Sequence, residues 1–230
     1  ERQMEHANIG TAQHAVSADT QKVLRNTYML LGMTLAFSAV TAGISMSMNL
    51  GHGIAMIMSL AALAIVWVVL PRTANTAMGL PVVFLFTGLL GAALGPMLNR
   101  YLAMPNGAEM VMQALGGTAV IFFSLSAYVL TTKKDFSFMG GFLFAGLMVV
   151  IVGAIGAMVA SYFFGVDVSL FSLALSGAIV LLMSGLILFD TSRIINGGET
   201  NYIMATVGLY LNLYNLFTAL LHIIGATSDD

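Results

Sequence analysis

The stretch that decides the fold comes late in the sequence, where residues 202–224 read YIMATVGLYLNLYNLFTALLHII. It contains no Asp, Glu, Lys or Arg. A helix needs about 20 predominantly apolar residues to cross the hydrocarbon of a bilayer. The stretch therefore predicts a transmembrane helix, Tyr202–Ile224, and not a helix from the core of a water-soluble protein.

Six further runs of the same kind precede it. Of the 230 residues, 59% are hydrophobic and only 8% are charged, against about 25% charged residues in soluble domains. The runs are continuously apolar and do not alternate with a period of two, which excludes a membrane β-barrel. We predict an all-α, integral membrane bundle of seven transmembrane helices, whose first six spans are Tyr28–Met48, Ile54–Leu70, Met78–Leu98, Val111–Leu130, Phe138–Phe164 and Leu170–Phe189.

The predicted domain organisation is a single transmembrane domain over residues 23–226. A polar, poorly ordered cytoplasmic tail over residues 1–22 precedes it, and a short C-terminal tail over residues 227–230 follows. There is no HExxH, P-loop or nucleophile-elbow motif, no cysteine, and only scattered histidines. We therefore expect no enzymatic activity, no cofactor and no metal site. The absence of a basic patch argues against nucleic acid as a partner.

Basic residues in the loops predict the orientation. If the N-terminus is cytoplasmic, only Arg100 lies on the opposite side, and a cytoplasmic excess of Lys and Arg is typical of membrane proteins. We thus predict a cytoplasmic N-terminus and a periplasmic C-terminus. The cytoplasmic side then holds Arg2, Lys22, Arg25, Arg72, Lys133, Lys134 and Arg193.

Asp190 is the clearest ionisable residue at membrane depth, because it directly follows the apolar run that ends at Phe189. Ionisable groups in the bilayer are costly and mark candidate functional sites. Two interpretations remain open. Asp190 could form a salt bridge with Arg193 or Arg72 that fixes the inner end of the bundle, or it could belong to a proton- or cation-sensing gate.

The seventh predicted span carries polar side chains near its middle, namely Tyr210, Asn212, Tyr214 and Asn215. Asn212 and Asn215 are three residues apart and share a helix face. Such a face avoids lipid, so we predict that the seventh helix is central in the bundle. The asparagines then either form interhelical hydrogen bonds or line an internal cavity.

Small residues predict close helix packing in the third span. Gly88, Gly91 and Gly95 recur there, and Gly91 and Gly95 have the small-xxx-small spacing that lets helices approach in lipid. Pro96 removes a backbone hydrogen bond and predicts a kink or an end of this helix.

Two helix starts are predicted from capping residues. Asn106 with Glu109 resembles a capping box before the fourth helix. Thr200 or Asn201 is the expected N-cap of the seventh.

The chain resembles the Bax inhibitor-1 family and, within it, the bacterial YccA-like proteins. The resemblance covers nearly the whole chain. It rests on the runs KVLRNTY (22–28), LGP (94–96), SAYVLTTK (126–133), FDTSRII (189–195) and GGETNY (197–202).

This resemblance implies a seven-helix bundle in which the other helices surround the last one. It also implies a protein of the bacterial inner membrane that binds FtsH, the membrane-anchored ATP-dependent protease, and restrains its degradation of membrane proteins. The polar tail could be presented to a cytoplasmic ATPase. Glu1, Arg2 and Glu5 are therefore the partner-binding candidates.

An alternative function follows from other members of the family, which behave as pH-sensitive leaks for calcium ions. Their proposed sensor is a pair of aspartates, which makes Asp190, Arg193 and Asn212 the proton- or cation-sensing candidates here. Asp190 matches the first aspartate, and the second position holds Asn212. Two nearby carboxylates can share a proton, whereas a carboxylate and an amide cannot. The substitution weakens the calcium or proton leak as a function for this chain.

Overall fold

The computed structural model describes the backbone of residues 2–228 and the side chains of residues 18–228. Within that part the protein is all-helical, and seven helical stretches are long and apolar enough to cross a membrane. The prediction of a seven-span helical bundle is confirmed. The spans are Ala18–Ser47, His52–Thr73, Gly79–Leu102, Gly107–Thr132, Ser137–Phe164, Ser169–Ile195 and Tyr202–Ser228.

Four spans consist of one regular helix each. The first span lies in α1 (Arg2–Ser47), and the fourth is α6 (Gly107–Thr132). The sixth is α8 (Ser169–Ile195), and the seventh is α9 (Tyr202–Ser228). Each predicted apolar run lies almost entirely inside its observed helix. The helices extend beyond most of the runs, since polar residues at the ends can continue a helix into the interface.

The other three spans are interrupted or capped by irregular turns. The second contains α2 (His52–Ala64), a π-helical turn η1 (Ile65–Val69) and α3 (Leu70–Thr73). The third contains α4 (Gly79–Ala93) and α5 (Gly95–Leu102). The fifth opens with the short 3-10 helix η2 (Ser137–Met139) and continues as α7 (Gly140–Phe164).

Pro96 interrupts the third span without ending it. The regular helix stops before Leu94 and resumes at Gly95, with Pro96 in the first turn of α5. A proline at this place has no N–H to donate into the preceding turn. Of the two outcomes predicted for Pro96, the break within a continuing span is the observed one.

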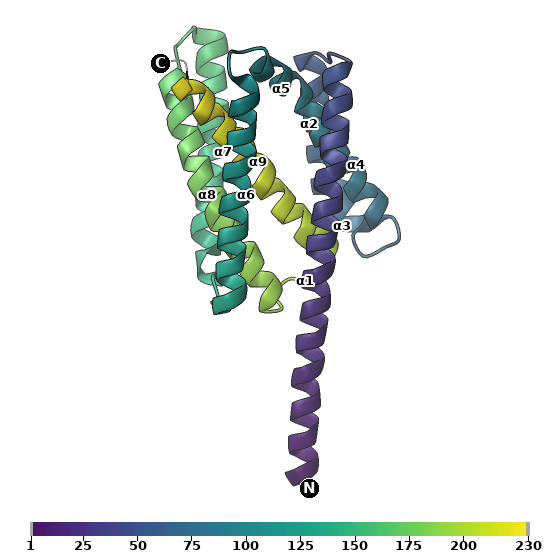
Figure 1. The fold of residues 1–230 in the computed structure, drawn as a ribbon. Helices are drawn as coiled ribbons and strands as arrows, with labels where there is room; N and C mark the ends of the chain where they lie inside the picture. Colours follow the sequence, from purple (N-terminus) through teal and green to yellow (C-terminus); the bar gives the residue numbers. More distant parts are fainter. Residues whose placement is uncertain (1, 229–230) are drawn as a thin grey trace.

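The helix α9 runs obliquely through the molecule, between a group formed by α1, α2 and α4 and a group formed by α6, α7 and α8 (Figure 1). It contacts α1, α4, α6 and α8. By contrast, α7 packs mainly against α8 on the outside of the bundle. The buried core accordingly gathers around α9, whose Leu209, Tyr210, Leu216 and Leu221 are almost fully buried.

Glycines allow α4 and α5 to lie against α1, as predicted from their spacing. A Cβ atom added to Gly91 would lie 2.4 Å from the backbone oxygen of Ser38, and one added to Gly95 would lie 2.0 Å from the Ser45 hydroxyl. At Gly88 it would lie 2.6 Å from the Phe37 ring. The side chain of any larger residue would therefore separate the two helices.

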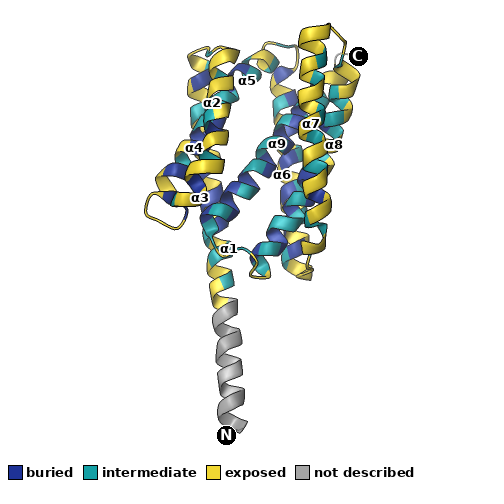
Figure 2. Ribbon diagram, turned by 180° about the vertical axis from the view of Figure 1, so that it is seen from behind, coloured by how far each residue is buried: buried dark blue, intermediate teal, exposed yellow. Residues whose placement is uncertain are grey.

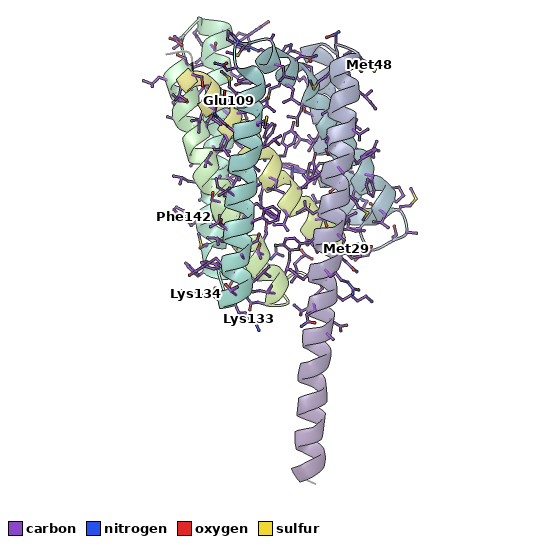
Figure 3. All side chains as sticks on the ribbon, viewed as in Figure 1. Met29, Met48, Glu109, Lys133, Lys134 and Phe142 are labelled. Carbon is purple, nitrogen blue, oxygen red and sulfur yellow. The ribbon has the colours of Figure 1, made fainter. Side chains whose placement is uncertain are left out.

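The outer surface is apolar over the spans, as Figure 2 shows most plainly for α7. Phe142 points away from the bundle (Figure 3) and is 76% exposed, and Trp67 is 78% exposed. A water-soluble protein rarely exposes contiguous apolar surface on this scale. These side chains are suited to contact lipid.

Labelled charged residues lie at both ends of the bundle. Lys133 and Lys134 lie at one end, where α6 finishes, and Glu109 lies at the other, close to the level of Met48 (Figure 3). The loop between α8 and α9 lies at the end with the lysines, and the loop between α3 and α4 lies in the lower half of the same view (Figure 1). Those loops follow Arg72 and Arg193.

The two capping predictions have opposite outcomes. Asn201 caps α9, because its Oδ1 accepts the N–H groups of Ile203 and Met204 at 2.9 and 3.1 Å. The capping box predicted for α6 is wrong. Asn106 has a φ of 60° and makes no side-chain cap, while Glu109 accepts a hydrogen bond from Gln113 instead. The side chain of a residue with a left-handed backbone does not point back over the first turn of the helix.

Candidate functional site

Asp190 and Asn212 meet between α8 and α9. The Nδ2 atom of Asn212 donates a hydrogen bond to Oδ2 of Asp190 at 2.7 Å. Asn212 is buried, with 4% of its surface exposed, and Asp190 is partly buried. A short hydrogen bond to a carboxylate is among the stronger contacts available in a protein. The two positions predicted to form a pair are therefore in direct contact.

Gly208 leaves room for this carboxylate. It lies one helical turn before Asn212 on α9, and a Cβ atom added there would be 3.2 Å from Oδ2 of Asp190. Gly208 was not predicted from the sequence, because a single glycine in an apolar span resembles any other packing glycine. Its position four residues before Asn212, on the same face of the helix, was the feature of the sequence that could have indicated it.

Arg193 does not form the ion pair that was one interpretation of Asp190. Its Nη2 atom lies 3.5 Å from Oε2 of Glu199, in the loop between α8 and α9. The guanidinium also lies over the ring of Phe189, 5.6 Å from the centroid. Among the described side chains Asp190 has no salt bridge, with Arg72 or any other residue. The described side chain that hydrogen-bonds to this carboxylate is the amide of Asn212.

The loop between α6 and α7 is attached to α8 two residues beyond Asp190. The backbone N–H of Phe136 donates to the hydroxyl of Ser192 at 2.8 Å, and Asp135 lies 3.4 Å from the same hydroxyl. Asp135 also accepts the backbone N–H of Ser137 at 2.8 Å. The hydrogen bonds from Ser137 hold the pKa of the Asp135 carboxyl below its usual value.

Tyr210 joins three helices through its hydroxyl group. The hydroxyl lies 2.7 Å from the hydroxyl of Ser38 on α1 and 3.2 Å from the carbonyl oxygen of Thr87 on α4. Ser38 in turn donates to the same carbonyl of Thr87 at 2.7 Å. The ring packs edge-on against Phe86. Tyr210 thus satisfies its polar group inside the core, and it fixes α9 against α1 and α4.

Tyr210 was predicted from the sequence, whereas Ser38 and Thr87 were not. Isolated hydroxyl residues in apolar runs usually bond to a carbonyl of their own helix. Thr87 does so, since its hydroxyl donates to Val83 at 3.0 Å, and only its carbonyl serves the network. Because every residue has a backbone carbonyl, a contact made through one cannot be predicted from the residue type.

Tyr214 and Asn215 differ from Asn212 in what they contact. The ring of Tyr214 stacks on Tyr210 at a centroid distance of 6.2 Å. Asn215 donates to the Leu211 carbonyl of its own helix at 2.9 Å. Both are partly buried. The four predicted polar residues therefore lie along α9, and Asn212 and Tyr210 are the two of these four that hydrogen-bond to other helices. Elsewhere on α9, Thr206 bonds to the Thr27 carbonyl and His222 to Ser176.

Glu1, Arg2 and Glu5 lie outside the residues whose side chains the structure describes. Their assignment as partner-binding residues stays a prediction. Among the described residues, no three His, Asp or Glu side chains lie together as metal ligands would. The chemistry available at Asp190 is that of one carboxylate held by one amide. It can exchange a proton or attract a cation.

Comparison with known proteins identifies the family. The family described as "Inhibitor of apoptosis-promoting Bax1" matches residues 20–229. The chain is 52% identical to an uncharacterized membrane protein of Vibrio cholerae, over 92% of each chain. It is 50% identical to the Modulator of FtsH protease YccA of Escherichia coli K12, over 92% of this chain and 93% of that one.

Two further relatives add another genus and a cellular location. An uncharacterized protein of Pseudomonas aeruginosa is 44% identical over 94% of each chain. The relative from Escherichia coli O6:H1 is named Inner membrane protein YccA and is 50% identical over 92% of this chain. Together with the seven apolar helices, these matches show a multi-pass protein of the inner membrane that belongs to the Bax inhibitor-1 family.

Proposed function

We propose that this protein binds the membrane protease FtsH and restrains its degradation of membrane proteins. The observation that carries the proposal is the 50% identity, over 92% of the chain, to a protein named Modulator of FtsH protease. At that identity the spans and their loops align over almost their whole length. In this proposal the protein acts as a binding partner of the protease.

The topology that fits this function has a cytoplasmic N-terminus, a periplasmic C-terminus and α9 as the central helix. The basic loops at one end of the bundle support the orientation, because cytoplasmic loops carry an excess of Lys and Arg. The contacts of α9 with α1, α4, α6 and α8 support its central position. The tail then lies on the side of the membrane where an ATP-dependent protease takes hold of its substrates.

Co-purification with FtsH tests the proposal. The full chain and a form lacking residues 1–20 are expressed with tagged FtsH and solubilised in mild detergent. We expect the full chain to co-purify and its overproduction to lengthen the half-life of an FtsH membrane substrate. Association of neither form, or an unchanged half-life, would overturn the proposal.

A triple variant separates the charge of the tail from its length. Glu1→Gln, Arg2→Gln and Glu5→Gln keep the tail but remove its candidate charges. If the deletion loses FtsH and the triple variant keeps it, the tail acts through its length. If both lose it, the three named residues bind the partner.

A second candidate function is a proton or calcium leak gated at Asp190, and the hydrogen bond from Asn212 favours it. Opening a path for ions between α8 and α9 would break this hydrogen bond. The strength of the hydrogen bond would therefore determine how often the path opens. The test uses purified protein in liposomes that contain a calcium-sensitive dye. We compare the parent with Asp190→Asn, which removes the charge, and with Asp167→Asn, which removes a carboxylate from the turn between α7 and α8.

The two variants make the outcome specific to Asp190. A gating role predicts that Asp190→Asn changes the leak or its pH dependence while Asp167→Asn leaves both unchanged. Asn212→Asp would place two carboxyl groups within hydrogen-bond distance, where they share a proton, and should make the leak more strongly pH-dependent. Equal leak rates for the parent and Asp190→Asn at every pH would exclude the gate.

A further inference from the structure

An apolar groove of about 470 Å³ lies between α1 and α6, on the face where Figure 1 shows these helices standing apart with α9 behind them. Its mouth is flanked by Leu35, Leu115 and Phe123, which are 38%, 54% and 66% exposed. The groove therefore opens sideways, toward the lipid. Its walls also include Ser38, Ala39, Ala42, Gly43, Met46, Leu94, Leu98, Val111, Thr118, Ala119, Phe122, Tyr210, Leu213, Tyr214 and Phe217.

The length of the groove matches one leaflet of a bilayer. Along α1 its wall extends from Leu35, near the middle of the span, to Met46, beside the end of the helix. At 1.5 Å per residue, these positions are about 16 Å apart. Half of a hydrocarbon core about 30 Å thick is about 15 Å. The groove thus runs from the bilayer midplane to the interface at the end where α1 finishes.

Three of the four hydroxyl groups in the wall, those of Ser38, Thr118 and Tyr210, already have partners in the protein. The Ser38 hydroxyl donates to the carbonyl of Thr87, and the Tyr210 hydroxyl bonds to Ser38. The Thr118 hydroxyl donates to the carbonyl of Ala114 at 2.7 Å. The rest of the wall is aliphatic or aromatic, apart from the Tyr214 hydroxyl. A pure hydrocarbon can fill such a site without leaving these buried donors unpaired.

The form of the groove suits a hydrocarbon chain better than a helix from another protein. A helix with side chains is about 10–12 Å across. The groove lies between two neighbouring helices, α1 and α6, with α9 behind it. A single flexible hydrocarbon chain is narrow enough to enter between the exposed side chains at the mouth.

We propose that this groove binds one acyl chain of a membrane lipid, drawn from the leaflet at the end of the bundle where α1 finishes. The chain lies between α1 and α6 and contacts α9 along its length. Lipid binding at this place stabilises the separation of α1 from α6. It also puts lipid in contact with Tyr210, which joins α9 to α1 and α4.

Filling the groove tests the proposal. Gly43 lines it, and a Cβ atom added there meets nothing within 4 Å, so the side chain of Gly43→Phe can start into the groove. Gly156 on α7 has the same free space and does not line the groove, which makes Gly156→Phe the matched control. Ala119→Phe fills the groove from α6 and provides a second variant if Gly43→Phe does not fold.

The full-length protein and the variants are reconstituted in vesicles of phosphatidylethanolamine and phosphatidylglycerol. The vesicles contain a trace of phosphatidylethanolamine with a photoreactive diazirine on one acyl chain, and labelled residues are mapped by mass spectrometry. For the parent we expect labelling of groove residues to exceed labelling of the lipid-facing side of α7. In Gly43→Phe or Ala119→Phe the groove label should fall about tenfold, a loss of about 1.4 kcal/mol of binding free energy.

Each outcome decides the question. Gly156→Phe should keep the groove label of the parent. Equal labelling of the groove and of α7 in the parent would mean that only bulk lipid is present, and it would overturn the proposal. Groove labelling that survives both filling variants would overturn it as well, and so would a partner protein cross-linked in the groove of native membranes.

Discussion

Asn212 and Asn215 offer a test at the scale of single residues. Asn212 donates to Asp190 on another helix, whereas Asn215 bonds only within α9. Asn212→Leu leaves a partly buried carboxylate without its donor, and a hydrogen bond to a charged group contributes about 1.5–3 kcal/mol. We expect Asn212→Leu to lower the free energy of unfolding in detergent micelles by that amount. Asn215→Leu should change it by less than about 0.5 kcal/mol, and equal effects of the two would contradict the assignment.

Asp135 makes stability depend on pH. Hydrogen bonds from Ser137 lower the pKa of Asp135 below 3.8 in the folded protein. A lowered pKa stabilises the fold when the carboxyl is ionised, and the contribution is lost as the pH falls through the folded pKa. Asp135→Asn keeps the acceptor oxygen but cannot ionise. The parent should therefore melt at a higher temperature than Asp135→Asn at neutral pH, and the difference should close at pH values below 3.8. A difference that is constant with pH would contradict this origin.

At the scale of elements, the contact of α4 with α1 depends on Gly91. An alanine there would bring its Cβ within 2.4 Å of the Ser38 backbone and of the Thr41 hydroxyl, so the helices must separate. Overpacking of this kind costs about 1–3 kcal/mol. Gly116 on α6 has no atom within 4 Å of an added Cβ. Gly116→Ala should instead stabilise the protein, by up to about 1 kcal/mol of helix propensity. Thermal unfolding of both variants checks the opposite signs.

The sequence predicted these elements well where lipid alone determines them. Each span followed from the length and polarity of one apolar run, since only a closed set of hydrogen bonds crosses hydrocarbon. The π-helical turn Ile65–Val69 was not predicted, because Ile, Val and Trp fit either helix type equally well. The capping box at Asn106 failed because the backbone there is left-handed. Turn geometry depends on how the neighbouring helices pack, and no short motif specifies that.

The candidate site was predictable only in part, for the same reason. Asp190 and Asn212 were found as polar residues in apolar runs, and the resemblance paired them. The partner of Arg193 was not found, since Glu199 becomes its neighbour only when the chain turns between α8 and α9. Ser38 and Thr87 were missed because the carbonyl that joins them to Tyr210 is common to every residue.

At the scale of the whole molecule, the proposed orientation can be tested with single cysteines, since the chain has none of its own. Val166 lies in the turn between α7 and α8, and Lys134 lies in the loop after α6. We expect a membrane-impermeant maleimide to label Val166→Cys on the outer face of spheroplasts. Lys134→Cys should be labelled only after the membrane is broken. The reverse pattern would place the N-terminus outside the cytoplasm.

The depth at which α9 is buried has a consequence for biogenesis. The helix α9 follows the six other spans along the chain, so it leaves the ribosome after all of them. Until it inserts, Ser38 and the Thr87 carbonyl lack Tyr210, and Asp190 lacks Asn212. The earlier spans can enter the membrane, but the bundle cannot close until α9 has taken its place among them. Completion of the core is thereby a late event in synthesis, and a chain that stalls before α9 presents quality control with exposed polar groups inside the bilayer.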